Sequence, residues 1–191
     1  MQRNINLRGH DVFTFQFSIH IERKPGECDM NKDHVEFLAK DHNDYREKIA
    51  KQLVEIIDLT NGGTVITWNK SFEISRLKEL SKSAPRYRSE LNIIINHVYD
   101  LMDIFKGKKG TNIFAYRKSM KGSFSIKYVL PAYTDLTYDG MDIGNGLLAM
   151  AAYASYPKLS DSQHTKLTKD LILYCKQDTW AMVKLLQQAR G

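Results

Sequence analysis

The order of hydrophobic patterns along the chain constrains its fold more than any other feature. Val12–Ile21 alternates in polarity and is rich in aromatic and β-branched residues, which predicts a strand. Val35–Leu38 predicts a second, short strand, and Thr64–Trp68 predicts a buried strand after the break at Asn61–Gly63. Helical patterns alternate with and follow these strands. The order predicts an α/β fold in which helices flank a mixed sheet.

The predicted helices have apolar residues three and four positions apart. We expect Asp44 to cap the first helix, with Glu47 in the capping-box position. The stretch Val98–Phe105 predicts another strand or an extended segment, and Pro131 is expected to stop a short helix capped by Ser123 or Ser125. Further helices are expected at 71–82, 87–98, 145–156 and 171–186.

The composition indicates an ordinary globular protein. The 191 residues suit one domain, and 42% of them are hydrophobic and 26% charged. The formal net charge of +6 suits an anionic partner such as nucleic acid, although many basic proteins bind none. Cys28 and Cys175 form no CxxC pair, and no segment reaches the ~18 apolar residues of a membrane span. We therefore expect a cytoplasmic protein with free thiols and no membrane segment.

The last predicted helix carries an acid within its apolar stripe. Leu171, Cys175 and Met182 lie near the centre of that stripe, and Asp178 falls between Leu171 and Met182. Because an isolated buried carboxylate costs several kcal/mol, Asp178 needs a partner. A nearby arginine, a backbone donor or a divalent metal shared with other carboxylates could supply one. Tyr174 lies on the same helical face, since it precedes Asp178 by four residues.

Two further acids are candidates for the same site. Glu73 follows the strand that ends at Trp68 and lies in the first turn of the next helix, where the helix dipole alone would favour it. Asp100 follows Val98 and Tyr99 and could simply face solvent. Sites in α/β folds lie at the carboxyl ends of strands, which is where Glu73 is expected.

Several stretches resemble a bacterial domain family of unknown function that is similar to the DEDD-type, ribonuclease H-like 3′–5′ exonucleases. The resemblance runs from about Phe13 to Leu186. It rests on QFSIHI, NKSFE (Asn69–Glu73), YDLMDIF (Tyr99–Phe105), SFSIKYVLPA (Ser123–Ala132), DIGNG and YCKQDTWAMV (Tyr174–Val183). It implies a ribonuclease H-like sheet and phosphodiester hydrolysis by two Mg²⁺ or Mn²⁺ ions that carboxylates hold some ~3.5–4 Å apart.

The resemblance also implies roles for individual residues. Glu73 matches the second acidic motif, where the exonucleases more often have aspartate, and Asp178 matches the third motif. Tyr174 would orient the attacking water. Asp100 matches an acidic position near the metals whose role the resemblance does not define.

Asn69 and Phe72 match the segment leading into the second motif, where the exonucleases contact a terminal nucleotide. The implied partner is the 3′ end of a single strand of DNA or RNA.

One part of the family pattern is missing. The first motif of these nucleases is Asp-x-Glu on the central strand, and no Asp in this chain has Glu two residues later. We therefore expect a single ribonuclease H-like domain that lacks its central strand. We favour an N-terminally truncated fragment of an intact nuclease over the alternative, a natural short form that has lost catalysis. The loss of the strand should leave a gap or an unpaired sheet edge, through which the chain could form homo-oligomers.

Two functions follow from these patterns. The first is a metal-dependent 3′–5′ exonuclease domain, inactive or weak in this form because two of its four carboxylates are missing. The alternative is a non-catalytic module that binds nucleic acid or protein through the same cleft. The net charge and the basic GKKG loop with Lys108 and Lys109 favour the alternative.

Overall fold

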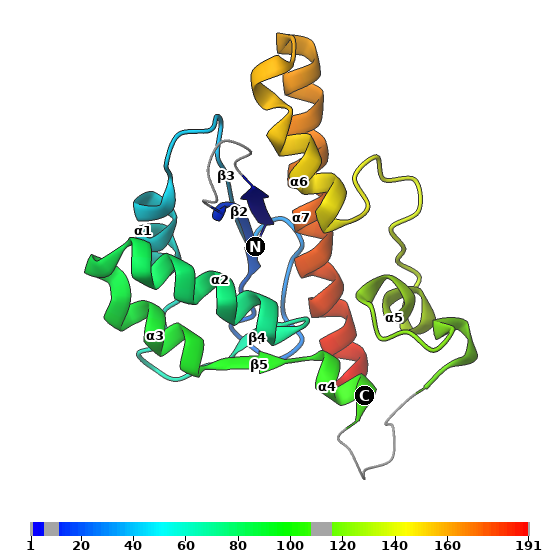
Figure 1. Ribbon diagram of the computed structural model, residues 1–191. Helices are drawn as coiled ribbons and strands as arrows, with labels where there is room; N and C mark the ends of the chain where they lie inside the picture. Colours follow the sequence, from blue (N-terminus) through cyan, green and yellow to red (C-terminus); the bar gives the residue numbers. More distant parts are fainter. Residues whose placement is uncertain (1, 6–11, 108–115, 191) are drawn as a thin grey trace.

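The computed structural model describes residues 2–5, 12–107 and 116–190 and shows a mixed α/β protein (Figure 1). This architecture confirms the predicted α/β class. Its strands are β1 (Gln2–Ile5), β2 (Val12–His20), β3 (His34–Leu38), β4 (Val65–Thr67) and β5 (Val98–Asp100). Its α-helices are α1 (Arg46–Ile56), α2 (Lys70–Ser83), α3 (Arg88–Asn96), α4 (Met102–Lys106), α5 (Ile126–Tyr133), α6 (Gly146–Ala154) and α7 (Asp161–Arg190).

The strands form two sheets in place of the single mixed sheet expected from the sequence. β1, β2 and β3 make an antiparallel sheet with β2 in the middle, and β4 and β5 form a separate parallel pair. Within the described residues no ladder joins β2 to β4. β1 pairs with Val12–Gln16, so within the described residues Phe17–His20 has a strand partner on the β3 side alone.

Helices cover the strands from two sides (Figure 1). One hydrophobic cluster lies between the antiparallel sheet and α1, α2 and α3, and it includes Phe17, Leu53 and Leu77. The other lies among α5, α6 and α7 and includes Phe15 and Tyr153, whose rings stack with centroids 4.0 Å apart. Each fully buried side chain of this kind contributes roughly 1.5–3 kcal/mol, so both clusters hold α7 and α2 against the strands.

Helix α7 is fastened to β2 by polar side chains. Side chains alternate across a strand, so Gln16, Ser18 and His20 share one face of β2. Gln16 Nε2 donates to the Leu171 carbonyl over 2.9 Å. Thr179 Oγ1 lies 2.9 Å from Ser18 Oγ and 2.8 Å from His20 Nδ1. These contacts set the position of α7 along the sheet and therefore that of its neighbouring acid.

α7 begins at Asp161, ten residues before the helix predicted at 171–186. A reciprocal capping box explains the earlier start. The Ser160 N–H donates to Gln163 Oε1 over 3.0 Å, and the Gln163 N–H donates to Ser160 Oγ over 3.4 Å. The pattern Ser-x-x-Gln was present in the sequence, but the segment after it has few apolar residues to indicate a helix.

Three other local predictions need correction. The stretch Val98–Phe105 is a strand only as far as Asp100, because the Asp100 carboxylate accepts the Met102 N–H at 3.2 Å and α4 begins there. Pro131 lies inside α5, which continues to Tyr133. Asp44 is not the N-cap of α1, since Tyr45 occupies that position, although Asp44 Oδ1 accepts the Arg46 N–H at 3.0 Å.

Other predictions concern the thiols, the membrane and the basic loop. Cys28 and Cys175 are both free, as expected. No helix within the described ranges combines the length and apolar character that crossing a membrane requires. Lys108 and Lys109 of the GKKG loop lie outside the described residues.

Candidate functional site

The turn between β4 and α2 positions the start of α2, where Glu73 lies. Asp100 stabilises this turn. Asn69 adopts a left-handed conformation (φ 69°, ψ 68°), which asparagine tolerates better than most residues. Asp100 accepts the Asn69 N–H at 2.9 Å and the Lys70 N–H at 2.8 Å, with one carboxylate oxygen for each. A carboxylate at a helix N-terminus is also favoured by the helix dipole. Glu73 follows in the first turn of α2.

The contacts of Asp100 explain its burial without a metal. Its side chain is buried and bonds three backbone N–H groups, those of Asn69, Lys70 and Met102. We infer that Asp100 acts by fixing the turn before Glu73. Its predicted place among metal ligands stays a prediction.

Asp178 on α7 points inward and is half-buried, in the position predicted from the helical pattern. Its partners are tyrosine hydroxyls. Tyr138 Oη donates to Asp178 Oδ1 over 2.7 Å, and the Tyr174 side chain also hydrogen-bonds the carboxylate. The inward acid therefore has the hydrogen-bonding partners that a carboxylate removed from water requires.

Electrostatics link Asp178 to Glu73. Burial raises the pKa of Asp178, the hydrogen bonds from Tyr138 and Tyr174 lower it in part, and the negative charge of Glu73 raises it further. Glu73 also contributes to the raised pKa of the neighbouring Cys175 thiol, where burial is the largest cause. A like charge nearby disfavours the ionised form of a carboxyl group, which is the direction of the effect of Glu73 on Asp178. The structure thus brings Tyr174 and Asp178 together on α7, with Glu73 of α2 within electrostatic reach.

Phe72 and Asn69 lie at the same end of α2 as Glu73. The Phe72 ring is 39% exposed, and the Arg76 guanidinium lies 5.4 Å from its centroid. Asn69 Oδ1 accepts a hydrogen bond from Ser71 Oγ over 3.1 Å. An exposed aromatic face of this kind can stack on a nucleobase.

Two neighbours of the site were missed from the sequence. Tyr138 lies in the loop before α6, forty residues from Asp178, and no periodic pattern relates the two. Arg76 is buried on α2, where Nη2 donates to Glu79 over 2.7 Å while Nε and Nη1 have no partner within the described residues. Its position four residues after Phe72 was the available signal.

The described residues do not complete a two-metal centre. Within residues 2–5, 12–107 and 116–190, no group of three or more His, Cys, Asp or Glu side chains is placed to hold a metal ion. Glu73 and Asp178 supply two carboxylates, whereas hard divalent cations take six or more oxygen ligands, some of them from water. The pair fits part of a cation site.

The fold and site define an α/β protein with an inward carboxylate on its last helix, held by two tyrosine hydroxyls. Comparison with known proteins gives its family. The chain belongs to the family described as Domain of unknown function (DUF2779), whose model matches residues 2–125. This match confirms the predicted membership of a family of unknown function. The link to nucleases stays a prediction.

A relative extends the similarity beyond the family match. The chain is 28% identical over 187 residues to an uncharacterized protein of Ureaplasma parvum serovar 3, covering 86% of this chain and 27% of that protein. The chain therefore spans about a quarter of the length of this relative. No solved structure matches the chain.

Proposed function

We propose that this chain belongs to a divalent-metal-dependent nuclease domain that hydrolyses phosphodiesters from the 3′ end of DNA or RNA. The observation that carries the proposal is the Asp178 carboxylate, which lies inward on α7 against the hydroxyls of Tyr138 and Tyr174 and within electrostatic reach of Glu73. Carboxylates paired in this way suit Mg²⁺ or Mn²⁺. Further oxygen ligands have to come from outside the described residues, so we assign no catalytic step through a metal to this chain.

The arrangement of strands supports the same proposal. The β2 edge at Phe17–His20 and one edge of β4 lack strand partners within the described part of the chain. An extended segment between them would join both sheets into one mixed sheet, as a ribonuclease H-like fold requires.

The remaining site residues would act on the nucleic acid. Phe72 offers its exposed ring to the terminal base, and Asn69 lies three residues away in the turn. Tyr174 would orient the attacking water through its hydroxyl, which already bonds Asp178.

Mn²⁺ binding to the purified chain, followed by electron paramagnetic resonance, tests the proposal. We expect a weak site, with a dissociation constant of about 10⁻⁴–10⁻³ M, because the protein supplies few ligands. Glu73→Gln and Asp178→Asn should each weaken it about 10-fold or more. Asp103→Asn is the matched control, since Asp103 is a partly exposed acid on α4 that pairs with Lys70. Equal Mn²⁺ binding by the wild type, Glu73→Gln and Asp178→Asn would contradict the proposal.

Cleavage of labelled single strands in Mn²⁺ is the second measurement. We expect slow or undetectable cleavage by this chain, and any Mn²⁺-dependent cleavage should be lost in Asp178→Asn. Cleavage that is equal in both proteins would show that another site is responsible.

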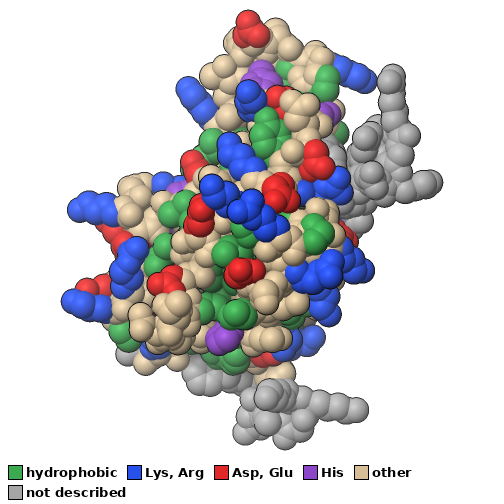
Figure 2. Space-filling view, turned by 90° about the vertical axis from the view of Figure 1, so that its left-hand side faces the viewer, with side chains coloured by type: hydrophobic (Ala, Val, Ile, Leu, Met, Phe, Trp, Pro, Cys, Tyr) green, Lys and Arg blue, Asp and Glu red, His purple; other side chains and the backbone are tan. Residues whose placement is uncertain are grey.

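The alternative, a non-catalytic binding module, has its own support in the incomplete carboxylate set and the net charge of +6. On the face shown in Figure 2, however, Lys and Arg side chains lie among Asp and Glu side chains. Binding of single strands that persists without a divalent cation and is unchanged in Asp178→Asn would favour the module over the nuclease.

A further inference from the structure

One segment of the chain carries all of its excess positive charge. Residues 104–134 contain seven of the 28 Lys and Arg residues and none of the 22 Asp and Glu residues, so the rest of the chain has a net charge of −1. Lys108 and Lys109 of this segment lie outside the described residues. The described part includes a 3₁₀ turn (Lys118–Met120), which packs on α5. Charge of one sign gathered in this way attracts polyanions.

The lysines of this segment are not used in ion pairs. Within the described residues, Lys118, Lys121 and Lys127 have no acidic partner, whereas Lys51 and Lys166 elsewhere pair with carboxylates. Lys118 and Lys121 are exposed, and Lys127 is half-buried in the first turn of α5. Ammonium groups of this kind are available to phosphates, and binding to them releases counterions from the nucleic acid.

Two exposed aromatic rings lie among these lysines. Tyr116 is 49% exposed and Tyr128 is 43% exposed. Tyr128 follows Lys127 in the first turn of α5. Tyr116 Oη accepts the Gly122 N–H at 3.0 Å, which places its ring beside the residue that follows Lys121. Lysines with interleaved aromatic rings are typical of surfaces that bind single strands, because bases stack on the rings while phosphates meet the ammonium groups.

The segment is held in a defined shape. Met120 is fully buried in the hydrophobic cluster around α7, and the next two residues, Lys121 and Gly122, turn the chain with φ values of 51° and 78°. Trp68 Nε1 donates to the Phe124 carbonyl over 3.1 Å and joins the segment to the end of β4. A surface that is ordered before binding loses less conformational entropy when a ligand arrives.

We propose that Tyr116, Lys118, Lys121, Lys127 and Tyr128, the α5 surface, bind single-stranded nucleic acid. The lysines contact phosphates, and the tyrosine rings stack on bases. The inference goes beyond the proposed function, because the α5 surface holds the strand for a nuclease and is equally the binding site of a non-catalytic module. None of its contacts involves a cation.

Fluorescence anisotropy of a labelled 20-nucleotide oligothymidylate in EDTA tests the lysines. Each phosphate contact contributes ~0.7 to the slope of log affinity against log salt concentration. The triple variant Lys118→Gln, Lys121→Asn, Lys127→Gln should therefore reduce the slope by about 2 and weaken binding about 10-fold or more at low salt. Asparagine replaces Lys121 because it tolerates a positive φ.

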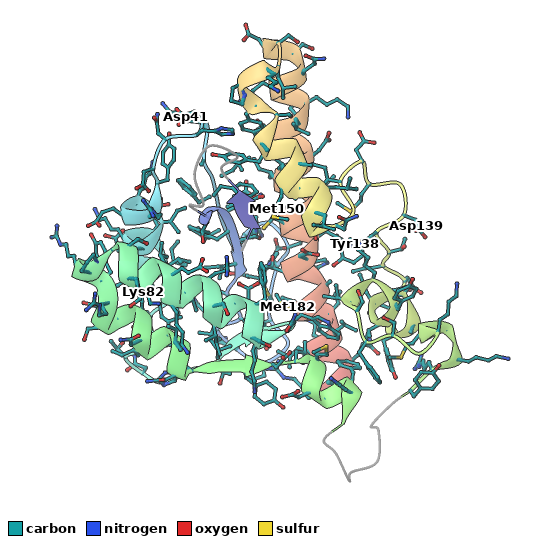
Figure 3. All side chains as sticks on the ribbon, in the orientation of Figure 1. Asp41, Lys82, Tyr138, Asp139, Met150 and Met182 are labelled. Carbon is teal, nitrogen blue, oxygen red and sulfur yellow. The ribbon has the colours of Figure 1, made fainter. Side chains whose placement is uncertain are left out.

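A second triple variant controls for net charge. Lys51→Gln, Lys78→Gln, Lys82→Gln removes the same charge from exposed positions on α1 and α2, and Lys82 lies across the molecule from α5 (Figure 3). This control should change the slope by less than half as much. Equal losses in the two triple variants would show a response to net charge alone and overturn the inference.

Tyr128→Ala tests the stacking. We expect about 5-fold weaker binding with an unchanged salt slope. Tyr99→Ala is the matched control, since Tyr99 on β5 is also 43% exposed, and it should bind like the wild type. Wild-type affinity in Tyr128→Ala would overturn the inference. So would a wild-type chain that binds phosphatidylserine vesicles through the three lysines but does not bind the oligothymidylate, because the surface would then serve a membrane.

This inference and the proposed function can fail separately. Mn²⁺ binding depends on Glu73 and Asp178, whereas the oligothymidylate in EDTA reports on the α5 surface. Because the α5 surface binds without a cation, the nuclease and the module are distinguished by the binding that the lysine variant retains. Oligothymidylate binding that is the same in the wild type and in the Lys118, Lys121 and Lys127 variant overturns the inference and leaves the proposed function standing.

Discussion

At the scale of single residues, the two inward acids have different partners and different consequences. Asp178 meets phenol hydroxyls from two segments, while Asp100 meets backbone N–H groups at the start of α2 and α4. The helical pattern correctly indicated that Asp178 would need a partner. It could not identify Tyr138, because that partner comes from a loop whose path depends on tertiary packing.

Removing the Asp100 carboxylate should destabilise the protein. Asp100→Ala leaves three backbone donors without their acceptor, and we expect the free energy of unfolding to fall by about 2–3 kcal/mol. Asp100→Asn should cost about half as much, because the amide keeps one acceptor oxygen. Denaturant unfolding measures both values.

Asp103→Ala provides the control for this prediction. Asp103 is partly exposed and pairs with Lys70 at 3.6 Å, so its loss should change the free energy of unfolding by about 0–1 kcal/mol. An Asp100→Asn protein with wild-type stability and weakened Mn²⁺ binding would instead make Asp100 a metal ligand.

At the scale of elements, two histidines lie where α7 meets the antiparallel sheet. The ring centroids of His20 and His34 are 4.7 Å apart, and His34 Nε2 lies 2.7 Å from Ser18 Oγ. Burial lowers the pKa of His34 to about 4, with the charges of His20 and Lys176 acting in the same direction. Burial is also the largest cause of the lowered pKa of His20.

These lowered pKa values predict a loss of stability in mild acid. The unfolded histidines titrate near 6.5, so between about pH 6.5 and 4 the unfolded chain takes up protons that the folded chain excludes. Stability is therefore full above pH 6.5 and falls as the pH drops toward 4. Carboxylates whose pKa is lowered, such as Asp44, act below this window. Burial raises the pKa of Glu36 and Asp178, so these two groups take up protons in the folded chain and offset part of the histidine effect. Tm measured from pH 7.5 to 4.5 should fall accordingly.

His34→Gln should reduce the fall of Tm with decreasing pH, because it removes one of the two buried histidines. His97→Gln is the control, since His97 follows α3 and its ring bonds the Ile93 carbonyl at an exposed position. An unchanged Tm from pH 7.5 to 4.5 in the wild type would refute the prediction.

At the scale of the whole molecule, periodicity predicted elements better than their assembly. The alternation in Val12–Ile21 correctly predicted β2. The apolar spacing predicted α1, α2 and α6, with first and last residues that differ slightly from those in the structure. The separation into two sheets was beyond the sequence pattern, because periodicity identifies strands but does not determine which strands pair. The shared site of Glu73 and Asp178 stays a prediction from the family resemblance, whereas the contact of Tyr138 with Asp178 had no signal in the sequence.

The incompletely paired edges of β2 and β4 bear on self-association. Unpaired N–H and C=O groups along a strand can bind another chain, so we expect the average mass in light scattering to rise above 22.1 kDa as concentration increases. A constant monomer mass up to the highest soluble concentration would argue against pairing through these edges.

The attachment of α7 to β2 also determines when the protein can finish folding during synthesis. Gln16 donates to the carbonyl of Leu171, which the ribosome adds 155 residues later. At a synthesis rate of roughly 5–20 residues per second, Leu171 is added about 8–30 s after Gln16. During that interval the polar face of β2 has no helix against it, so Gln16 is hydrated until α7 arrives.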